Sequence, residues 1–185
     1  MKKILATVFI FALLCGDASA DMLGTLRGKY DLDIACGDFL SVAIPLSAAI
    51  YSAAIGDWEG ELQLAQSCAA TIALTQGLKY AVNAERPNGG RRSFPSGHSS
   101  SAFMGAAYWQ MRYGWEFGVP MYAAAALVCY TRVDAEAHYW RDVIAGAAIG
   151  IGFNYLFTSR FENDKMQMSL IPMRNGASLN FSIRF

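Results

Sequence analysis

The chain has little of the charge that soluble proteins carry on their surfaces. Only 16% of its 185 residues are charged, against about 25% in an average soluble domain, and 54% are hydrophobic. Fifteen basic and fifteen acidic side chains cancel. The basic surplus typical of nucleic-acid binding is therefore missing, and we expect no nucleic-acid partner. The length suits one domain with a core, and the apolar excess is too small to decide alone between a membrane protein and an exported helical one.

Histidine and cysteine are also scarce. The two histidines and four cysteines are scattered without the spacing of metal ligands, so we expect no metal and no cofactor. Cys36, Cys68 and Cys129 follow the first apolar segment, and three is an odd number, so at least one should be unpaired or form an intermolecular bond. Cys68 and Cys129 lie in apolar stretches, where a cysteine usually behaves as a small buried hydrophobe.

Residues 1–20 have the pattern of a signal peptide. Lys2 and Lys3 precede an apolar run from Ile4 to Cys15, and Ala18-Ser19-Ala20 forms an A-x-A cleavage site. Export would place the remaining cysteines in an oxidising compartment. The alternative is an uncleaved first membrane helix. We expect a helical domain over residues 21–165, with a mixed, loosely structured or short-helical lead-in up to Gly37, and a separate tail over residues 166–185.

Hydrophobic runs and breakers predict an all-α bundle of about five to six helices. The expected helices are Phe39–Gly56, Leu62–Val82, Ser99–Tyr113, Val119–Tyr130 and Val143–Phe157, with a loop over Asn83–Phe94. Pro45 is expected to interrupt the first of these runs. Two of the runs approach the roughly 17 to 20 residues that span a bilayer, and aromatic residues stand at several run ends. We expect membrane association; the alternative is a compact exported domain whose helices bury one another.

The tail changes pattern. Apolar and polar residues alternate from Leu179 to Phe185, and Asn175-Gly176 is a strong hairpin turn signal. The tail therefore predicts a short C-terminal β-hairpin. Because a single hairpin is marginal alone, it should pack on the bundle, on a partner or on another copy.

Three segments carry candidate chemistry. Pro95-Ser96-Gly97-His98 predicts a capped helix start, where unpaired N–H groups and the helix dipole favour an anion. Lys79 and Arg86 flank a helix end, where cations can simply complement the dipole. His138 and Asp142 are four residues apart, so on a helix they would share a face and the carboxylate could orient the imidazole. Each segment alone is also compatible with an ordinary surface residue or polar pair.

Together, the three segments resemble the signature of the type 2 phosphatidic acid phosphatase superfamily, which includes bacterial acid phosphatases and vanadium haloperoxidases. They read Lys79-x6-Arg86-Pro87, Pro95-Ser96-Gly97-His98 and Thr131-Arg132-x5-His138-x3-Asp142. Thr131 stands where the family has serine, which keeps the hydroxyl. Both histidines of the chain occupy motif positions. The stretch from Glu85 to Ser100 looks most like short bacterial lipid phosphatases, including lipid A 1-phosphatases.

The resemblance implies a metal-independent phosphatase. His138 would attack phosphorus to form a phosphohistidine, Asp142 would support its ring, and His98 would protonate the leaving oxygen. The phosphoryl oxygens would be bound by Lys79, Arg86, Ser96, Gly97 and Arg132. The implied substrate is a phosphomonoester or pyrophosphate of a membrane lipid: phosphatidic acid, phosphatidylglycerophosphate, an isoprenyl pyrophosphate or lipid A. The site would face the periplasm from a bacterial membrane. No protein partner is indicated.

Three alternatives remain open at this stage. The first is a soluble periplasmic non-specific acid phosphatase, which differs in not pelleting with membranes. The second is a vanadate-dependent haloperoxidase, which would require added vanadate. The third is a non-enzymatic envelope protein with an idle anion pocket, which would show no activity on a chromogenic phosphate ester.

Overall fold

We describe the protein from a computed structural model that covers residues 32–161, 166–173 and 176–183, with side chains for residues 34–161. The predicted signal peptide, most of the lead-in and the ends of the tail lie outside the described residues.

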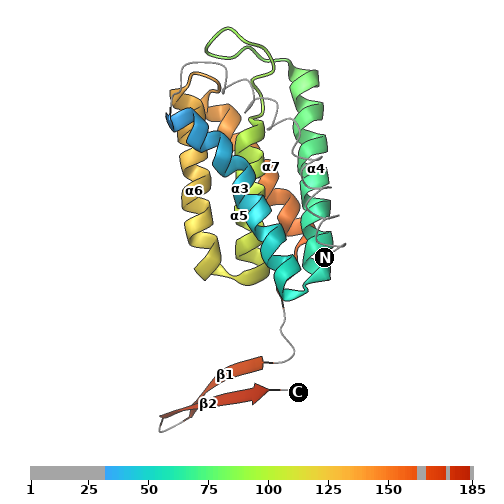
Figure 1. Ribbon diagram of the computed structural model, residues 1–185, viewed down its shortest axis with the longest axis vertical. Helices are drawn as coiled ribbons and strands as arrows, with labels where there is room; N and C mark the ends of the chain where they lie inside the picture. The colour runs from blue at the N-terminus through green and yellow to red at the C-terminus, as the bar shows by residue number, and fades with distance from the viewer. Residues whose placement is uncertain (1–31, 162–165, 174–175, 184–185) are drawn as a thin grey trace.

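Residues 32–161 form a bundle of five α-helices, in which four surround a central one. The elements are α3 (Leu32–Ile55), α4 (Trp58–Val82), α5 (Gly97–Tyr108), η1 (Trp109–Tyr113), α6 (Trp115–Asp134) and α7 (Trp140–Phe157). Helix α5 packs against α3, α4, α6 and α7 (Figure 1), and most of its side chains are buried. The predicted all-helical bundle is confirmed. Three expected runs lie within α4, α6 and α7, the run Phe39–Gly56 lies in α3 except for its last residue, and the run Ser99–Tyr113 is divided between α5 and η1.

The structure changes three details of the prediction. Helix α3 begins at Leu32, inside the segment expected to be a mixed, loosely structured or short-helical lead-in. Pro45 does not interrupt α3, because its ring is buried against α5 at Gly105, where an added Cβ would lie 2.6 Å from the Pro45 nitrogen. The last turn of the expected helix ending at Tyr113 is the π-helix η1, a single wide turn of a kind that hydrophobic spacing does not reveal.

Glycines let α7 approach α5 closely. A Cβ added at Gly150 would lie 2.4 Å from the Ser100 carbonyl oxygen, whereas a Cβ added at Gly152 would have no atom within 4 Å. We therefore expect Gly150→Ala to destabilise the fold by about 1–3 kcal/mol through overpacking. Gly152→Ala is the matched control and should be neutral or stabilising by up to about 1 kcal/mol, since alanine favours the helix. Thermal unfolding of both variants in detergent checks this; equal stability would contradict the close packing.

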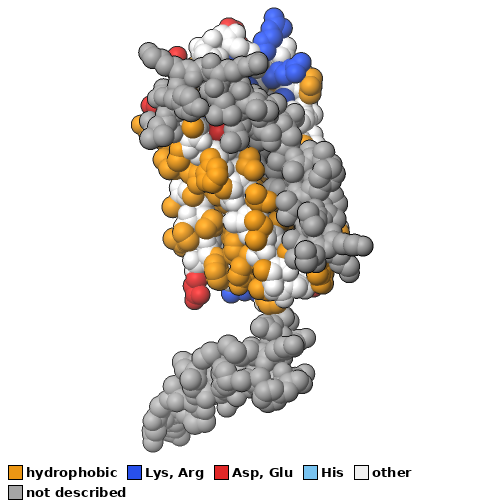
Figure 2. Space-filling model, in the orientation of Figure 1, with side chains coloured by type: hydrophobic (Ala, Val, Ile, Leu, Met, Phe, Trp, Pro, Cys, Tyr) orange, Lys and Arg blue, Asp and Glu red, His pale blue; other side chains and the backbone are white. Residues whose placement is uncertain are grey.

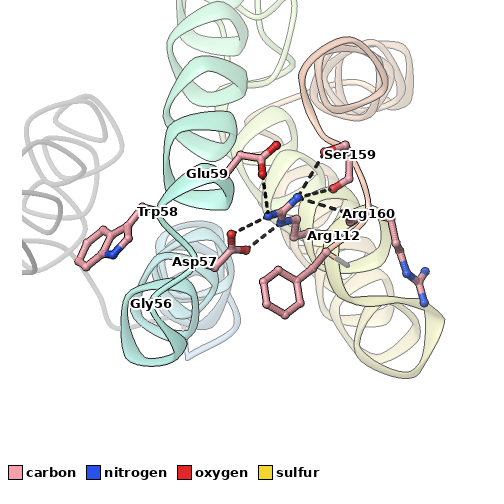
Figure 3. A pocket seen from close by; sticks show the side chains of 8 residues that line it. Gly56, Asp57, Trp58, Glu59, Arg112, Ser159 and Arg160 are labelled. Atoms are coloured by element: carbon pink, nitrogen blue, oxygen red, sulfur yellow. Dashed lines mark hydrogen bonds and ion pairs between the residues drawn. The ribbon is translucent and has the colours of Figure 1, made fainter. Parts of the chain in front are cut away.

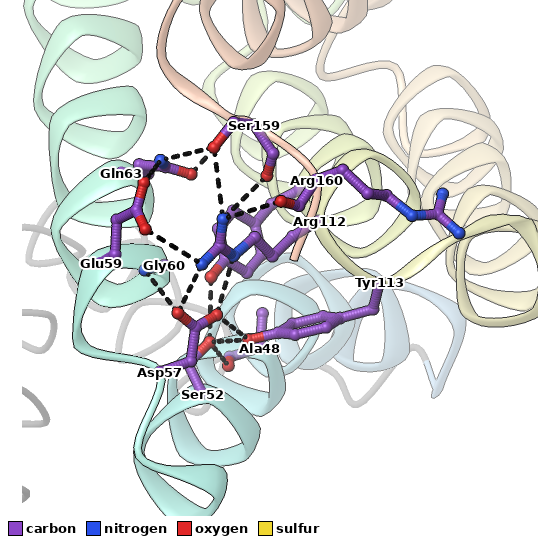
Figure 4. A network of polar contacts seen from close by, with 11 residues as sticks. Ala48, Ser52, Asp57, Glu59, Gly60, Gln63, Arg112, Tyr113, Ser159 and Arg160 are labelled. Carbon is purple, nitrogen blue, oxygen red and sulfur yellow. Dashed lines mark hydrogen bonds and ion pairs between the residues drawn. The ribbon is translucent and has the colours of Figure 1, made fainter. Parts of the chain in front are cut away.

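A buried ion pair ties the bundle together at the end where α3 meets α4. The Arg112 guanidinium donates to both Asp57 carboxylate oxygens, at 2.8 and 2.6 Å, and to the Ser159 carbonyl at 3.0 Å (Figure 4). Asp57 also accepts from the Tyr113 hydroxyl and the Gly60 N–H. We call this network the clasp. It joins the α3–α4 turn, η1 and the chain that follows α7.

A pocket lies beside the clasp. Figure 3 shows its lining, which is Gly56, Asp57, Trp58, Glu59, Arg112, Ser159, Arg160 and Phe161. Because Arg112 already donates through all three of its nitrogens, it offers this pocket no strong anion-binding group. The pocket therefore belongs to the structural clasp.

The tail contains two strands, β1 (Met166–Met173) and β2 (Gly176–Ile183), paired antiparallel with Met166 opposite Ile183. A hairpin that packs on the bundle, a partner or another copy stays a prediction. Within the described residues, Cys36, Cys68 and Cys129 form no disulfide with one another; Cys36 is exposed and the other two are buried.

Candidate active site

The candidate site residues lie at the end of the bundle opposite the clasp. They come from the last turns of α4 and α6, the first turns of α5 and α7, and the loops between (Figure 1). The structure brings together all eight residues that the sequence singled out: Lys79, Arg86, Ser96, Gly97, His98, Arg132, His138 and Asp142.

The start of α5 has the predicted cap. Ser96 is the N-cap residue, and its Oγ accepts hydrogen bonds from the Ser99 N–H at 3.4 Å and the Ser99 hydroxyl at 3.1 Å. The Ser96 N–H donates to the Asp142 carbonyl at 3.0 Å, which joins α5 to α7. His98 stands in the first turn and is buried. The Ser96 hydroxyl can still donate its own hydrogen to an anion.

Lys79 and Arg86 both reach the loop that precedes α5. Lys79 Nζ donates to the Arg92 carbonyl at 3.0 Å, and Arg86 Nε donates to the Arg91 carbonyl at 3.2 Å. The Lys79 stem passes Gly97, since an added Cβ there would lie 3.7 Å from Lys79 Cε. Both cations therefore lie close to the loop that leads into the N-terminus of α5.

His138 and Asp142 face each other, although not on one helix as predicted. Helix α7 begins at Trp140, and His138 lies in the turn before it. His138 Nδ1 is 3.8 Å from Asp142 Oδ2, which is too long for a hydrogen bond. Asp142 instead accepts from the Tyr139 N–H at 3.0 Å, which caps the helix, and from the Ser93 hydroxyl.

Ser93 is a site residue that the sequence reasoning missed. It is fully buried, and its Oγ lies between Asp142 Oδ2, to which it donates, and His138 Nδ1 at 3.4 Å. With its hydrogen given to Asp142, the Ser93 oxygen can accept only from a protonated Nδ1. That tautomer leaves the lone pair on Nε2 free. Ser93 stands three residues before Ser96 in the sequence, but it belongs to none of the three motifs, so the sequence offered no reason to single it out.

Asp38 of α3 is a second site residue that was missed. Its Oδ1 accepts from Arg132 Nη1 and lies 3.0 Å from His98 Nε2, without the alignment of a hydrogen bond to the ring. Arg132 Nη2 donates to the Ile34 carbonyl at 2.7 Å. No sequence pattern connects Asp38 to the motifs, since it lies 60 positions before His98.

The site keeps His138 uncharged. Burial lowers the pKa of His138 to about 3, helped by the positive charges of Lys79, Arg86 and His98 and opposed by Asp142. A neutral imidazole at neutral pH is the form that can act as a nucleophile.

The described residues include no group of three or more histidine, cysteine, aspartate or glutamate side chains placed to hold a metal ion. What the site offers is a lysine, two arginines and a helix start around two imidazoles. This donor set suits a phosphoryl group, because it supplies positive charge and N–H donors toward several oxygens at once.

Comparison with known families agrees with this chemistry. The PAP2 superfamily matches the chain over residues 60–166. The chain belongs to this superfamily. The match includes all three motif segments and runs from the first turn of α4 through α7, and it leaves α3 outside.

Relatives of the PAP2 chain are named as lipid phosphatases. It is 35% identical over 148 residues to a lipid A 4'-phosphatase of Helicobacter pylori strain J99, covering 74% of each chain. It is 33% identical over 129 residues to a lipid A 1-phosphatase of Helicobacter pylori strain 26695, covering 65% of this chain and 64% of that one. A lipid phosphate phosphatase 2 of Arabidopsis thaliana is 35% identical over 77 residues, which are 34% of this chain and 26% of the relative. No solved structure matches.

Proposed function

We propose that this protein is a membrane lipid phosphatase that removes a phosphate group through a phosphohistidine at His138, with lipid A as the favoured substrate class. The observation that carries the proposal is the convergence of three cations and two buried histidines at one end of the bundle. The names of the relatives favour a phosphorylated lipid.

The geometry supports a two-step mechanism. His138 Nε2 attacks phosphorus, the bond to the lipid oxygen breaks, and His98 gives that oxygen a proton. Ser93 and Asp142 hold the His138 ring through Nδ1 and stabilise the positive charge that develops on it. Water then attacks the phosphohistidine, His98 takes a proton from it, and inorganic phosphate leaves.

The remaining residues bind the phosphoryl oxygens. Lys79, Arg86 and Arg132 supply positive charge, and the Ser96 hydroxyl and Gly97 N–H supply hydrogen bonds at the α5 start. In the structure Lys79 and Arg86 donate to carbonyl oxygens of the loop that precedes α5. A bound phosphate would compete with those carbonyls, so substrate binding and the position of the loop over residues 86–93 should be coupled.

The distribution of charge along the chain supports the proposal of membrane insertion. Five stretches carry no Asp, Glu, Lys or Arg: residues 39–56, 62–78, 99–111, 117–131 and 143–159. Each has 13 to 18 residues, which is roughly 20–27 Å of helix. Charged residues gather at the clasp end and at the site end. This is the charge distribution of a bundle that crosses the hydrocarbon core of a bilayer.

The outer surface of the bundle supports the same proposal. Figure 2 shows hydrophobic side chains over the middle of the visible face and charged ones toward its two ends. All four outer helices expose large hydrophobic residues, such as Ile50, Leu74, Leu127 and Ile144. Exposed aromatics lie near both ends, among them Trp58, Trp115 and Tyr155 at the clasp end and Tyr80, Tyr130 and Trp140 at the site end. Within the described residues, Ile34–Ile55 is long and apolar enough to span a membrane by itself, with a mean hydropathy of 1.6.

We propose that the site end faces the periplasm. This end carries more lysine and arginine than the clasp end, which alone would favour the cytoplasm. However, Lys79, Arg86 and Arg132 are needed there as phosphate ligands, and the export signal favours the periplasm.

Cys36 provides the test of orientation, because it is exposed near the site end while Cys68 and Cys129 are buried. A membrane-impermeant maleimide should label wild-type protein in spheroplasts with intact inner membranes, and Cys36→Ser should lose the label. Labelling only after the cells are lysed would place the site end in the cytoplasm.

The substrate proposal is tested with the purified protein in detergent. Phosphate release and thin-layer analysis are compared for lipid A, phosphatidic acid, phosphatidylglycerophosphate, an isoprenyl pyrophosphate and p-nitrophenyl phosphate. We expect lipid A to have the highest kcat/KM. Activity confined to the water-soluble ester, from protein that stays in solution when membranes are pelleted, would favour a soluble acid phosphatase instead.

A further inference from the structure

We infer that Asp38, in the second turn of α3, is a positioning residue of the active site that acts through His98 and Arg132. The inference rests on the proposed phosphatase function. Asp38 lies outside residues 60–166, where the superfamily matches, so the family motifs do not include it.

The first argument is burial with two site partners. The Asp38 side chain is 2% exposed, and a carboxylate is rarely buried unless charged or hydrogen-bonding groups compensate it. The same oxygen, Oδ1, faces His98 Nε2 at 3.0 Å and accepts from Arg132 Nη1. One carboxylate oxygen therefore contacts both the proposed proton donor and a proposed phosphate ligand.

The second argument is that α3 is built to reach the site. An added Cβ at Gly37 would lie 2.1 Å from Thr131 Oγ1 and 2.8 Å from Arg132 Nη2, so only glycine allows this turn to pack there. The Ile34 carbonyl accepts from Arg132 Nη2, and the Ser101 hydroxyl donates to the Ser41 carbonyl at 2.8 Å. The position of Asp38 is thus fixed from both sides by α6 and α5.

The third argument is charge. Lys79, Arg86, Arg132 and Arg141 bring positive charge to this end of the bundle, and Asp142, the other buried carboxylate there, lies 3.5 Å from Arg141 Nε. Asp38 supplies the negative charge that faces Arg132 and His98. A carboxylate 3.0 Å from His98 Nε2 also fixes the orientation of the ring that gives the leaving oxygen its proton. The Arg132 contact holds the guanidinium in place before the phosphate arrives.

The test uses two aryl esters of nearly equal size. p-Nitrophenolate leaves easily, whereas phenolate is more basic and depends more on a proton donor. If Asp38 acts through His98, Asp38→Asn should lower kcat/KM for phenyl phosphate at least about fivefold more than for p-nitrophenyl phosphate. Asp38→Glu, which keeps the charge, should recover most of this difference. Asp134→Asn removes an exposed carboxylate at the same end of the bundle and should change both esters by less than about twofold.

The outcomes separate the inference from the function on which it rests. Wild-type protein that hydrolyses neither ester nor any lipid phosphate contradicts both. Active wild type with an Asp38→Asn variant that loses both esters equally, in step with its melting temperature, shows a structural role only and overturns the inference. If Asp38→Asn does not fold, Asp38→Ser, which also removes the charge, takes its place and is compared in the wild-type and His98→Gln backgrounds. An altered ester preference only where His98 is present supports the inference, and any other pattern overturns it.

Discussion

Replacing His138 with alanine is expected to lower turnover at least about a thousandfold while the protein still folds. Alanine removes the atom that attacks phosphorus, together with the ring nitrogen that Ser93 and, through it, Asp142 align. The backbone N–H of residue 138 can still donate to the Arg132 carbonyl in the variant, so the turn keeps this hydrogen bond. Phosphate release from lipid and from p-nitrophenyl phosphate measures the loss.

The control for this variant lies in the same turn. Glu136→Gln changes an exposed side chain two residues away and should keep activity within about twofold of wild type. Both variants should melt within a few degrees of wild type. Normal phosphate release from His138→Ala would remove this residue from the mechanism, and the proposed function with it.

Replacing Arg112 with methionine is expected to destabilise the fold by about 3–5 kcal/mol, because it leaves Asp57 buried without its partner. The Arg112 and Asp57 side chains are 3% and 2% exposed and share two short hydrogen bonds. Methionine fills similar space, so the loss reports charge and hydrogen bonding more than packing. Thermal or denaturant unfolding in detergent measures it.

Two comparisons make this result specific. Arg160→Met removes a neighbouring exposed arginine and should cost less than about 0.5 kcal/mol. Adding Asp57→Asn to Arg112→Met should recover part of the lost stability, because the uncompensated charge is then gone. An Arg112→Met variant as stable as wild type would show that the clasp does not stabilise the contact between the α3–α4 turn, η1 and the chain that follows α7.

Much of the fold could be predicted because it depends on local pattern. The runs ending at Val82 and Phe157 predicted the ends of α4 and α7, and Ser96 predicted the start of α5. The expectation that Pro45 interrupts its helix was wrong, because Pro45 packs against Gly105 of another helix, a contact that local sequence does not reveal.

The candidate site was predictable where residues follow a motif and not where contact is long-range. The four-residue spacing of His138 and Asp142 suggested one helix face. However, Tyr139 is extended, so the helix begins after His138 and the pair meets across its N-terminus. Ser93 and Asp38 reach the site only through the packing of loop 83–96 and of α3. Their roles depend on contacts with residues far away in the sequence, which the sequence alone does not reveal.

The most direct measurement for the whole account is capture of the phosphoenzyme. Purified protein is mixed with a labelled phosphate ester, quenched in alkali within milliseconds and digested, and the phosphorylated peptide is sequenced by mass spectrometry. The account predicts an acid-labile phosphate on the peptide that contains His138, present in wild type and absent in His138→Ala. Phosphate on another residue, or none while turnover proceeds and water attacks the ester directly, would contradict it.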